Sequence, residues 1–200
     1  MGWKASCIFI NKVSSDKNEL LNQIPYNLNK VEEIETLETA IMPDDKDFYL
    51  GEYKGKTIIC DFGLPFEFYS DEISEIESKL IDHFPNSTII AITLMSTVNH
   101  YGFAIIENGE KKRVKVGDYE NPVALEIGQI TKEEIELQKN SEVDEEGKRM
   151  FKDEDEMYSE DTVGEEYVFE ISSRIFGFEL NGPESDELFF ETKLEKFKKE

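Results

Sequence analysis

The chain is poor in the residues that most often build metal sites and disulfide frameworks. It has two cysteines, Cys7 and Cys60, and two histidines, His83 and His100, among 200 residues. Neither cysteine belongs to a C-x-x-C pair and no spacing of the four residues indicates zinc, so we predict no metal site. Both cysteines lie in apolar segments, which predicts buried free thiols in a reducing cytoplasm. A disulfide between them would require neighbouring strands.

Long apolar runs and phosphate-binding loops are also missing. The apolar runs are far shorter than the ~20 residues that a membrane-spanning helix needs, and the N-terminal segment is too polar for a signal peptide. We therefore expect a cytoplasmic protein with no membrane partner. No Gly-rich phosphate loop is present, which disfavours a nucleotide enzyme, and we predict no cofactor. The tripeptide Asp61-Phe62-Gly63 matches a kinase motif, but we attribute it to chance because no other kinase motif accompanies it.

Basic residues are scarce relative to acidic ones. The chain has 22 Lys and Arg against 45 Asp and Glu, which gives a net charge of −23. Such a chain is repelled by nucleic-acid phosphates and by anionic lipids, so we predict no nucleic-acid partner. The charge either serves solubility or indicates a basic protein partner. The apolar content of 38%, with 14 Phe and 8 Tyr, is sufficient for a packed core.

The chain is organised around the segment Thr88–Val116. Two apolar, β-branched runs are joined by a polar break at Ser96–His100, and a third run follows Asn108-Gly109. Asn-Gly between such runs is a strong hairpin signal, because both central residues of a type I′ turn need a positive φ. The first two runs are apolar on both pleat faces, which is typical of central strands. We therefore predict a three-stranded antiparallel meander.

The third strand of this meander has a different pattern. Val114 and Val116 alternate with Arg113 and Lys115, which predicts a half-exposed strand near an edge that its charges protect. With Lys111 and Lys112, the two cations form a basic cluster. Such a cluster indicates either internal charge pairing or a short anion site.

The remaining elements are predicted from hydrophobic period and turn residues. Strands are expected at Lys4–Asn11, Asp47–Leu50 and Lys56–Phe62. The segment Leu188–Phe197 fits either a strand or a helix, and we favour a strand followed by a frayed Lys-rich tail. Helices are expected from Ser14 or Ser15 to Pro25, over Leu28–Met42, over Ser70–Phe84, and from Val163 to Gly177. Residues 118–130 are expected to form a loop with one short strand.

Residues 131–162 hold thirteen acidic residues against five basic ones and few that could form a core. We interpret this segment as an acidic insert, either a mobile loop or a solvated helix, within a single domain that spans residues 1–200. The predicted fold is α+β: a mostly antiparallel central sheet of about five to seven strands covered by two or three helices.

Two functions from different classes are compatible with these patterns. The first is a non-enzymatic interaction module, similar to an inhibitor or immunity protein, that binds a basic partner through the acidic residues Asp153, Glu154, Asp155 and Glu156. The sequence assigns it no catalytic residue and leaves its oligomeric state open.

The second is a small-ligand-binding protein or a hydrolase-like enzyme with a site formed by Asp61, Ser96, His100 and Tyr101. A hydrolase would need Ser96 or Thr97 within hydrogen-bond reach of His100, with a carboxylate to orient the imidazole. No G-x-S-x-G motif is present. The competing interpretation is a hairpin connection whose Asn and Ser side chains satisfy the backbone.

Several short segments are similar to those of a known family. They are Ile41–Asp45, Tyr49–Gly55, Ile58–Asp61, Leu94–Val98, Gly102–Ile105, Glu107–Gly109 and Phe176–Gly182. Together they resemble an uncharacterised bacterial family, a domain of unknown function known mainly from actinobacterial sequences. That family's aromatic-Gly segment after the meander is not apparent here, where the acidic insert lies. The resemblance implies a bacterial cytoplasmic protein and carries over no catalytic residue.

Overall fold

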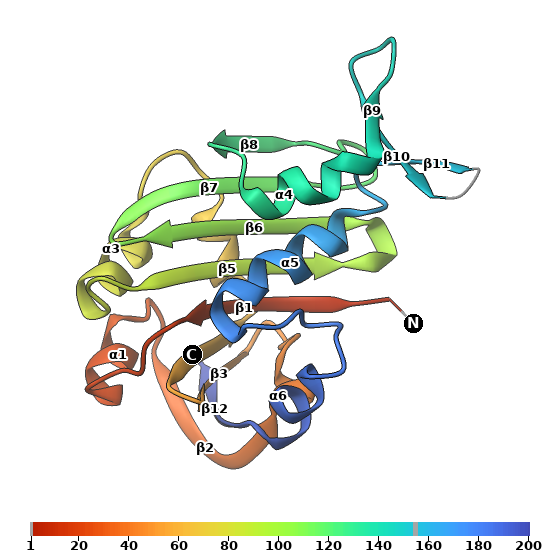
Figure 1. The fold of residues 1–200 in the computed structure, drawn as a ribbon. Helices are drawn as coiled ribbons and strands as arrows, with labels where there is room; N and C mark the ends of the chain where they lie inside the picture. The colour runs from red at the N-terminus through yellow and green to blue at the C-terminus, as the bar shows by residue number, and fades with distance from the viewer. Residues whose placement is uncertain (1, 154–155) are drawn as a thin grey trace.

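A computed structural model describes residues 2–153 and 156–200. Within these residues, nine strands form one antiparallel sheet in the order β2-β12-β3-β4-β1-β5-β6-β7-β8 (Figure 1). The strands are β1 (Lys4–Ile10), β2 (Leu28–Thr36), β3 (Asp47–Tyr53), β4 (Lys56–Asp61), β5 (Thr88–Met95), β6 (His100–Glu107), β7 (Glu110–Gly117), β8 (Leu125–Gly128) and β12 (Lys193–Lys199). The predicted single α+β domain is confirmed, with a wider sheet than expected.

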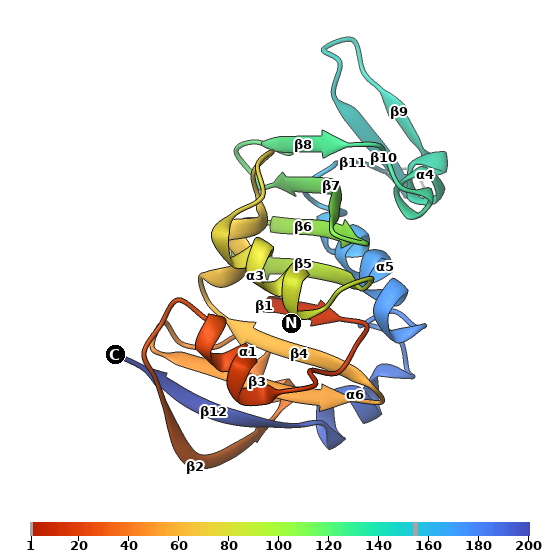
Figure 2. The same cartoon turned by 90° about the vertical axis from the view of Figure 1, so that its left-hand side faces the viewer.

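Helices cover both faces of this sheet (Figure 2). They are α1 (Lys17–Gln23), α2 (Leu37–Ala40), α3 (Glu75–His83), α4 (Lys132–Leu137), α5 (Gly164–Phe176) and α6 (Ser185–Glu191), with 3-10 turns η1 (Leu64–Phe68), η2 (Ser96–Val98) and η3 (Gln138–Asn140). One buried cluster lies between the sheet and α5 with α6, and the other lies under α1, α3 and η1. Because both faces are covered, the central strands are apolar on both sides.

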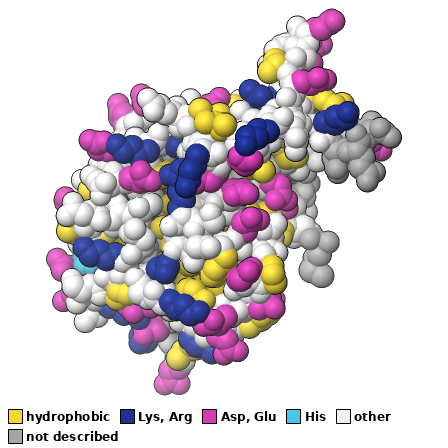
Figure 3. All heavy atoms as spheres, in the orientation of Figure 1, with side chains coloured by type: hydrophobic (Ala, Val, Ile, Leu, Met, Phe, Trp, Pro, Cys, Tyr) yellow, Lys and Arg dark blue, Asp and Glu magenta, His cyan; other side chains and the backbone are white. Residues whose placement is uncertain are grey.

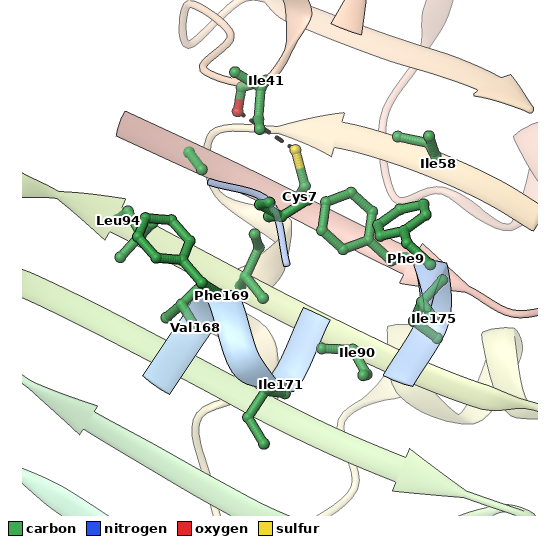
Figure 4. Packing of buried hydrophobic residues seen from close by; sticks show 14 of the residues in the cluster. Cys7, Phe9, Ile41, Ile58, Ile90, Leu94, Val168, Phe169, Ile171 and Ile175 are labelled. Atoms are coloured by element: carbon green, nitrogen blue, oxygen red, sulfur yellow. Dashed lines mark hydrogen bonds between the residues drawn. The ribbon is translucent and has the colours of Figure 1, made fainter. Parts of the chain in front are cut away.

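Helix α5 packs across the central strands. Its residues Val168, Ile171 and Ile175 belong to the same buried cluster as Phe9 of β1 and Ile90 of β5 (Figure 4). The helix ends as predicted at Gly177, which has φ 85° and so adopts the left-handed conformation that glycine accepts without steric cost.

The two helices on the opposite face begin later than predicted. Helix α3 begins at Glu75 with Ser74 as N-cap, because Ser74 and Glu77 form a reciprocal capping box. Helix α1 is capped by Asp16 and not by Ser14 or Ser15.

The predicted meander is confirmed as β5, β6 and β7. Asn108 has φ 53° and Gly109 has φ 81°, as the Asn-Gly turn requires. The prediction that β7 is half-exposed is wrong, because Arg113 and Lys115 are only 2% and 1% exposed. The strand does lie near an edge of the sheet, since among the described strands β8 alone lies beyond it. The two cations are buried because residues 131–162 cover them with carboxylates, so the internal charge pairing proposed for this cluster is present.

The helix predicted over Leu28–Met42 is wrong. Residues Leu28–Thr36 form the edge strand β2, and only Leu37–Ala40 are helical. The helical spacing of the apolar residues was misleading, since Ile34 is 62% exposed. Pairing with β12 holds the segment extended.

The strand predicted over Leu188–Phe197 is confirmed only from Lys193 onward, and the predicted frayed tail is wrong. The chain forms α6 and then β12, which lies between β2 and β3 and ends at Lys199. The tail is ordered because its backbone pairs with β2 and β3, and its lysines bind carboxylates of β3 and β4. Lys196 contacts Asp47 at 3.3 Å and Lys199 contacts Asp61 at 2.8 Å.

The acidic insert is neither a mobile loop nor a solvated helix in the part that the structure describes. It contains α4 and a second sheet of β9 (Ser141–Val143), β10 (Arg149–Asp153) and β11 (Glu156–Ser159). Thr131 and Glu134 form a capping box that starts α4. Glu134 and Glu160 are buried against Arg113 and Lys115. Two of the acidic residues that suggested disorder, Glu134 and Glu160, thus serve as buried ion-pair partners. The short strand expected within residues 118–130 is confirmed as β8.

Candidate binding site

A cavity of about 530 Å³ lies where β5 passes into β6 through η2. Its lining residues come from η1, from the β5–β6 turn and from the turn after β7. They are Phe66, Met95, Thr97, Val98, Asn99, His100, Asp118, Tyr119 and Glu120. Asn99 closes the β5–β6 turn in the left-handed conformation with φ 48°, which asparagine tolerates better than most residues.

His100 forms one wall of this cavity together with Phe66. The two rings stack with centroids 5.7 Å apart and planes 26° apart. A hydrogen bond of 2.8 Å joins His100 Nε2 to the Thr93 hydroxyl, which lies 3.0 Å from the Tyr69 hydroxyl. Burial lowers the pKa of His100, an effect that the nearby Asp118 carboxylate opposes. The imidazole is therefore neutral at neutral pH.

The turn after β7 supplies the acidic rim. Asp118 Oδ1 accepts hydrogen bonds from the backbone N–H groups of Glu120 at 2.9 Å and Asn121 at 2.8 Å, which fixes the turn. The Tyr119 N–H donates to the Val98 carbonyl at 3.2 Å and fastens this turn to the β5–β6 turn. The Tyr119 side chain is 75% exposed. Asp118 and Glu120 form no ion pair with the cations of the described residues.

The four residues predicted for a ligand site do not converge. His100 lines the cavity, but Tyr101 points to the opposite face of the sheet, where its hydroxyl donates to the Pro122 carbonyl at 2.7 Å. Ser96 lies under the N-terminal segment, where its N–H donates to the Trp3 carbonyl at 3.1 Å. The space beside the Ser96 hydroxyl is filled, because a Cβ at Gly2 would lie 1.9 Å from that oxygen.

Asp61 belongs to a separate buried group at the end of β4. Its Oδ1 accepts hydrogen bonds from the N–H groups of Gly63 at 2.9 Å and Leu64 at 2.8 Å, and its Oδ2 accepts one from Lys199 at 2.8 Å. The carboxylate thus anchors the start of η1 and the end of β12. Among the described residues, no hydroxyl of Ser96 or Thr97 is bonded to His100, so neither predicted nucleophile is paired with this base. The hydroxyl that His100 does contact belongs to Thr93, which is fully buried.

The acidic stretch proposed for partner binding lies at the β10–β11 turn. Asp153 and Glu156 are register partners across this hairpin, and Glu156 is exposed. Glu154 and Asp155 lie outside the described residues. The cavity and this hairpin lie at the same end of the main sheet (Figure 1).

A hydrogen bond joins the cavity rim to the root of the hairpin. The Asn99 amide donates from Nδ2 to Asp161 Oδ2 at 2.8 Å, just after β11. Further along the acidic segment, Figure 3 shows acidic side chains out to the tip of the protruding β9–β10 hairpin.

Sequence reasoning missed Phe66 and the turn of Asp118, Tyr119 and Glu120. The sequence around Asp118 carries the signature of a turn, but nothing in it indicates that this turn meets the β5–β6 connection. In the described residues, no three His, Cys, Asp or Glu side chains are placed to hold a metal ion. No helix among them has the length and apolar character to cross a membrane.

Comparisons with known proteins identify the family of this chain and give no information on its function. Neither the comparison with curated proteins nor the comparison with solved structures gave a match. A family model described as a family of unknown function (DUF6928) matches residues 18–195. The match spans every residue that lines the cavity and confirms the resemblance to a domain of unknown function. The chain therefore belongs to this family of unknown function, DUF6928.

Proposed function

We propose that the protein is a non-enzymatic bacterial interaction module that binds a basic protein partner, as inhibitor or immunity proteins do. The partner would dock at the end of the main sheet where the cavity and the β10–β11 hairpin meet. The observation that carries this proposal is the cavity itself. It combines aromatic residues with two carboxylates, Asp118 and Glu120, that make no ion pair within the described residues.

The distribution of charge supports this proposal. The most deeply buried cations, Arg113, Lys115 and Lys111, are each paired with a buried glutamate. These internal ion pairs use basic side chains that would otherwise lie on the surface. The excess of acidic residues in a chain of net charge −23 therefore lies on the surface. An acidic surface accelerates association with a basic partner and disfavours acidic competitors.

The cavity also favours a second candidate, a protein that binds a small ligand. Its volume of about 530 Å³ falls within the ~300–1,000 Å³ usual for small-molecule sites. A hydrolase-like activity is the weaker form of this candidate, because the hydroxyl that His100 contacts is that of Thr93, which is fully buried and out of reach of a substrate. The candidate predicts saturable binding of a metabolite without any protein partner.

The cellular location belongs to the same proposal. We place the protein in the bacterial cytoplasm because Cys7 and Cys60 are both free and their sulfur atoms lie 3.1 Å apart. A pair of thiols this close would be expected to oxidise in an oxidising compartment.

Site-specific photo-crosslinking tests the proposed function. A photoreactive phenylalanine derivative would replace Tyr119 at the cavity and, as a matched control, Glu32 on the edge strand β2. Both positions are exposed, and β2 lies at the far edge of the sheet from β8. Crosslinked proteins from the native host would be identified by mass spectrometry. The purified candidate would then be titrated against the wild type and against Asp118→Asn and Glu120→Gln.

The proposal predicts one basic protein that crosslinks from position 119 and not from position 32. Its affinity should fall with rising salt and should fall further in the two variants. A partner with an acidic or neutral surface, salt-independent binding, or equal crosslinking from both positions would contradict the proposed function.

A further inference from the structure

We infer that the cavity at the β5–β6 turn holds the guanidinium group of an arginine side chain, in preference to the ammonium group of a lysine. This inference rests on the proposed function, since it names the group by which the basic partner would be recognised. It follows from three properties of the lining: its charge, its hydrogen-bonding groups and its aromatic residues.

The polar groups of the lining can accept hydrogen bonds. Asp118 and Glu120 contribute carboxylates, and Thr97 contributes an exposed hydroxyl. The Asn99 amide is oriented by its donation to Asp161, which leaves its carbonyl oxygen as an acceptor. A guanidinium group has five N–H donors and no acceptor, so it matches such a lining. An anion would meet two carboxylates and is excluded.

The aromatic residues distinguish arginine from lysine. Phe66 and His100 are stacked on one another and both line the cavity, and the exposed Tyr119 stands on the acidic rim. A planar guanidinium group can stack on an aromatic ring and at the same time donate two parallel hydrogen bonds to one carboxylate. A lysine ammonium is a compact and strongly hydrated charge with no planar face and no fork of donors, so it fits the rings and carboxylates of this lining less closely.

His100 does not oppose a cation in the cavity. Its Nε2 is engaged with the Thr93 hydroxyl at 2.8 Å, and burial keeps its ring neutral at neutral pH. Asp118 already accepts two backbone N–H groups through Oδ1, so its position is fixed before a ligand arrives. Its Oδ2 forms no hydrogen bond within the described residues and can accept one from a guanidinium.

The test compares three capped tripeptides by NMR titration of the ¹⁵N-labelled protein. The probes are acetyl-Gly-Arg-Gly-amide, its lysine counterpart and its citrulline counterpart, a neutral analogue of nearly the same shape. The dissociation constants come from the amide shifts of residues 97–100 and 118–121. We expect the arginine probe to bind about fivefold more tightly than the lysine probe and the citrulline probe not to saturate.

Variants establish which groups hold the probe. Asp118→Asn removes the charge but keeps an oxygen that can accept the same two backbone hydrogen bonds, and Tyr119→Ala removes an exposed ring. Each should weaken the arginine probe by about threefold or more. Glu32→Gln, on an exposed edge, is the control and should leave the affinity unchanged. The native ¹⁵N spectrum of each variant verifies its fold.

The outcomes separate this inference from the proposed function. Equal affinity for the arginine and lysine probes would overturn the guanidinium preference and leave a general cation site. Shifts that avoid the cavity, or none at all, would overturn the inference even if crosslinking identifies a basic partner. Binding of the arginine probe without any basic partner would uphold the cavity's preference and overturn the proposed function instead.

Discussion

Arg113 and Glu134 form a two-pronged ion pair in the interior. Arg113 Nε lies 2.9 Å from Glu134 Oε2 and the Nη2 atom lies 2.6 Å from Oε1, with side chains that are 2% and 0% exposed. The pair joins β7 to α4 and is continued by Lys115, which contacts Glu160 at 2.5 Å. The acidic segment is therefore fixed to the main sheet by charges that water does not screen.

Breaking this pair should be far more destructive than breaking a surface pair on the same helix. Glu134→Gln leaves the buried Arg113 with the half-exposed Glu126 as its remaining carboxylate partner, so we expect a loss of about 3 kcal/mol in the free energy of unfolding, the low end for a broken buried pair. The control is Glu136→Gln, whose exposed pair with Lys139 should contribute less than ~0.5 kcal/mol. Urea denaturation measures both. Similar losses in the two variants would contradict the structural role of the buried pair.

Gly102 has no side chain, and this leaves room for the Tyr69 ring under the cavity. A Cβ at Gly102 would lie 2.8 Å from Thr93 Oγ1 and 2.9 Å from the Tyr69 ring. Gly102→Ala should therefore displace Tyr69 from the Thr93 hydroxyl, shift the His100 resonances and cost about 1–3 kcal/mol. Gly63→Ala is the control, since its new methyl group would meet nothing closer than 3.7 Å. A change in the His100 resonances for both variants alike would argue against this role.

The titration of His100 should make stability depend on pH. Burial lowers the pKa of His100 in the folded protein, so between that value and the unfolded value near ~6.5 the unfolded chain binds more protons. Stability contributed by the neutral ring is present above this window and is lost as the pH falls through it. Relative to His100→Gln, the wild type should therefore lose stability on acidification from about pH 8 to pH 5. Parallel curves from denaturation across this range would contradict this prediction.

The two cysteines should be unreactive until the protein unfolds. Cys7 and Cys60 are register partners on β1 and β4, both are fully buried, and burial raises the pKa of the Cys60 thiol. Because the thiolate is the reactive form, iodoacetamide should label neither residue in the native state and both in urea. Mass spectrometry of the labelled chain measures this. Rapid labelling of the native protein would show that β1 and β4 separate readily.

Local sequence signals were sufficient to predict those elements whose backbone conformation is set by their own residues. The Asn108-Gly109 turn specified a hairpin, and Gly177 specified where α5 ends, because each sets its own backbone conformation. The edge strand β2 could not be predicted, since it is extended only because β12, more than 150 residues away, pairs with it. The role of Arg113 was hidden for the same reason: its partner Glu134 lies in a segment whose composition suggested disorder.

The candidate site was predictable in part. The polar break between two apolar strands correctly marked a place where side chains gather, and His100 lies in the cavity there. Ser96, Tyr101 and Asp61 were assigned to the same site as His100 because of their side-chain chemistry. In the structure, however, Tyr101 points to the opposite face of the sheet and Asp61 anchors the start of η1. Phe66 and Tyr119 reach the cavity through tertiary contacts of two loops, which no local pattern encodes.

A crystal structure of the protein grown with acetyl-Gly-Arg-Gly-amide tests the account most directly. We predict the guanidinium group inside the cavity, stacked against Phe66 or Tyr119 and hydrogen-bonded to the carboxylate of Asp118 or Glu120. An empty cavity, with the peptide bound elsewhere on the acidic surface or not at all, would contradict it.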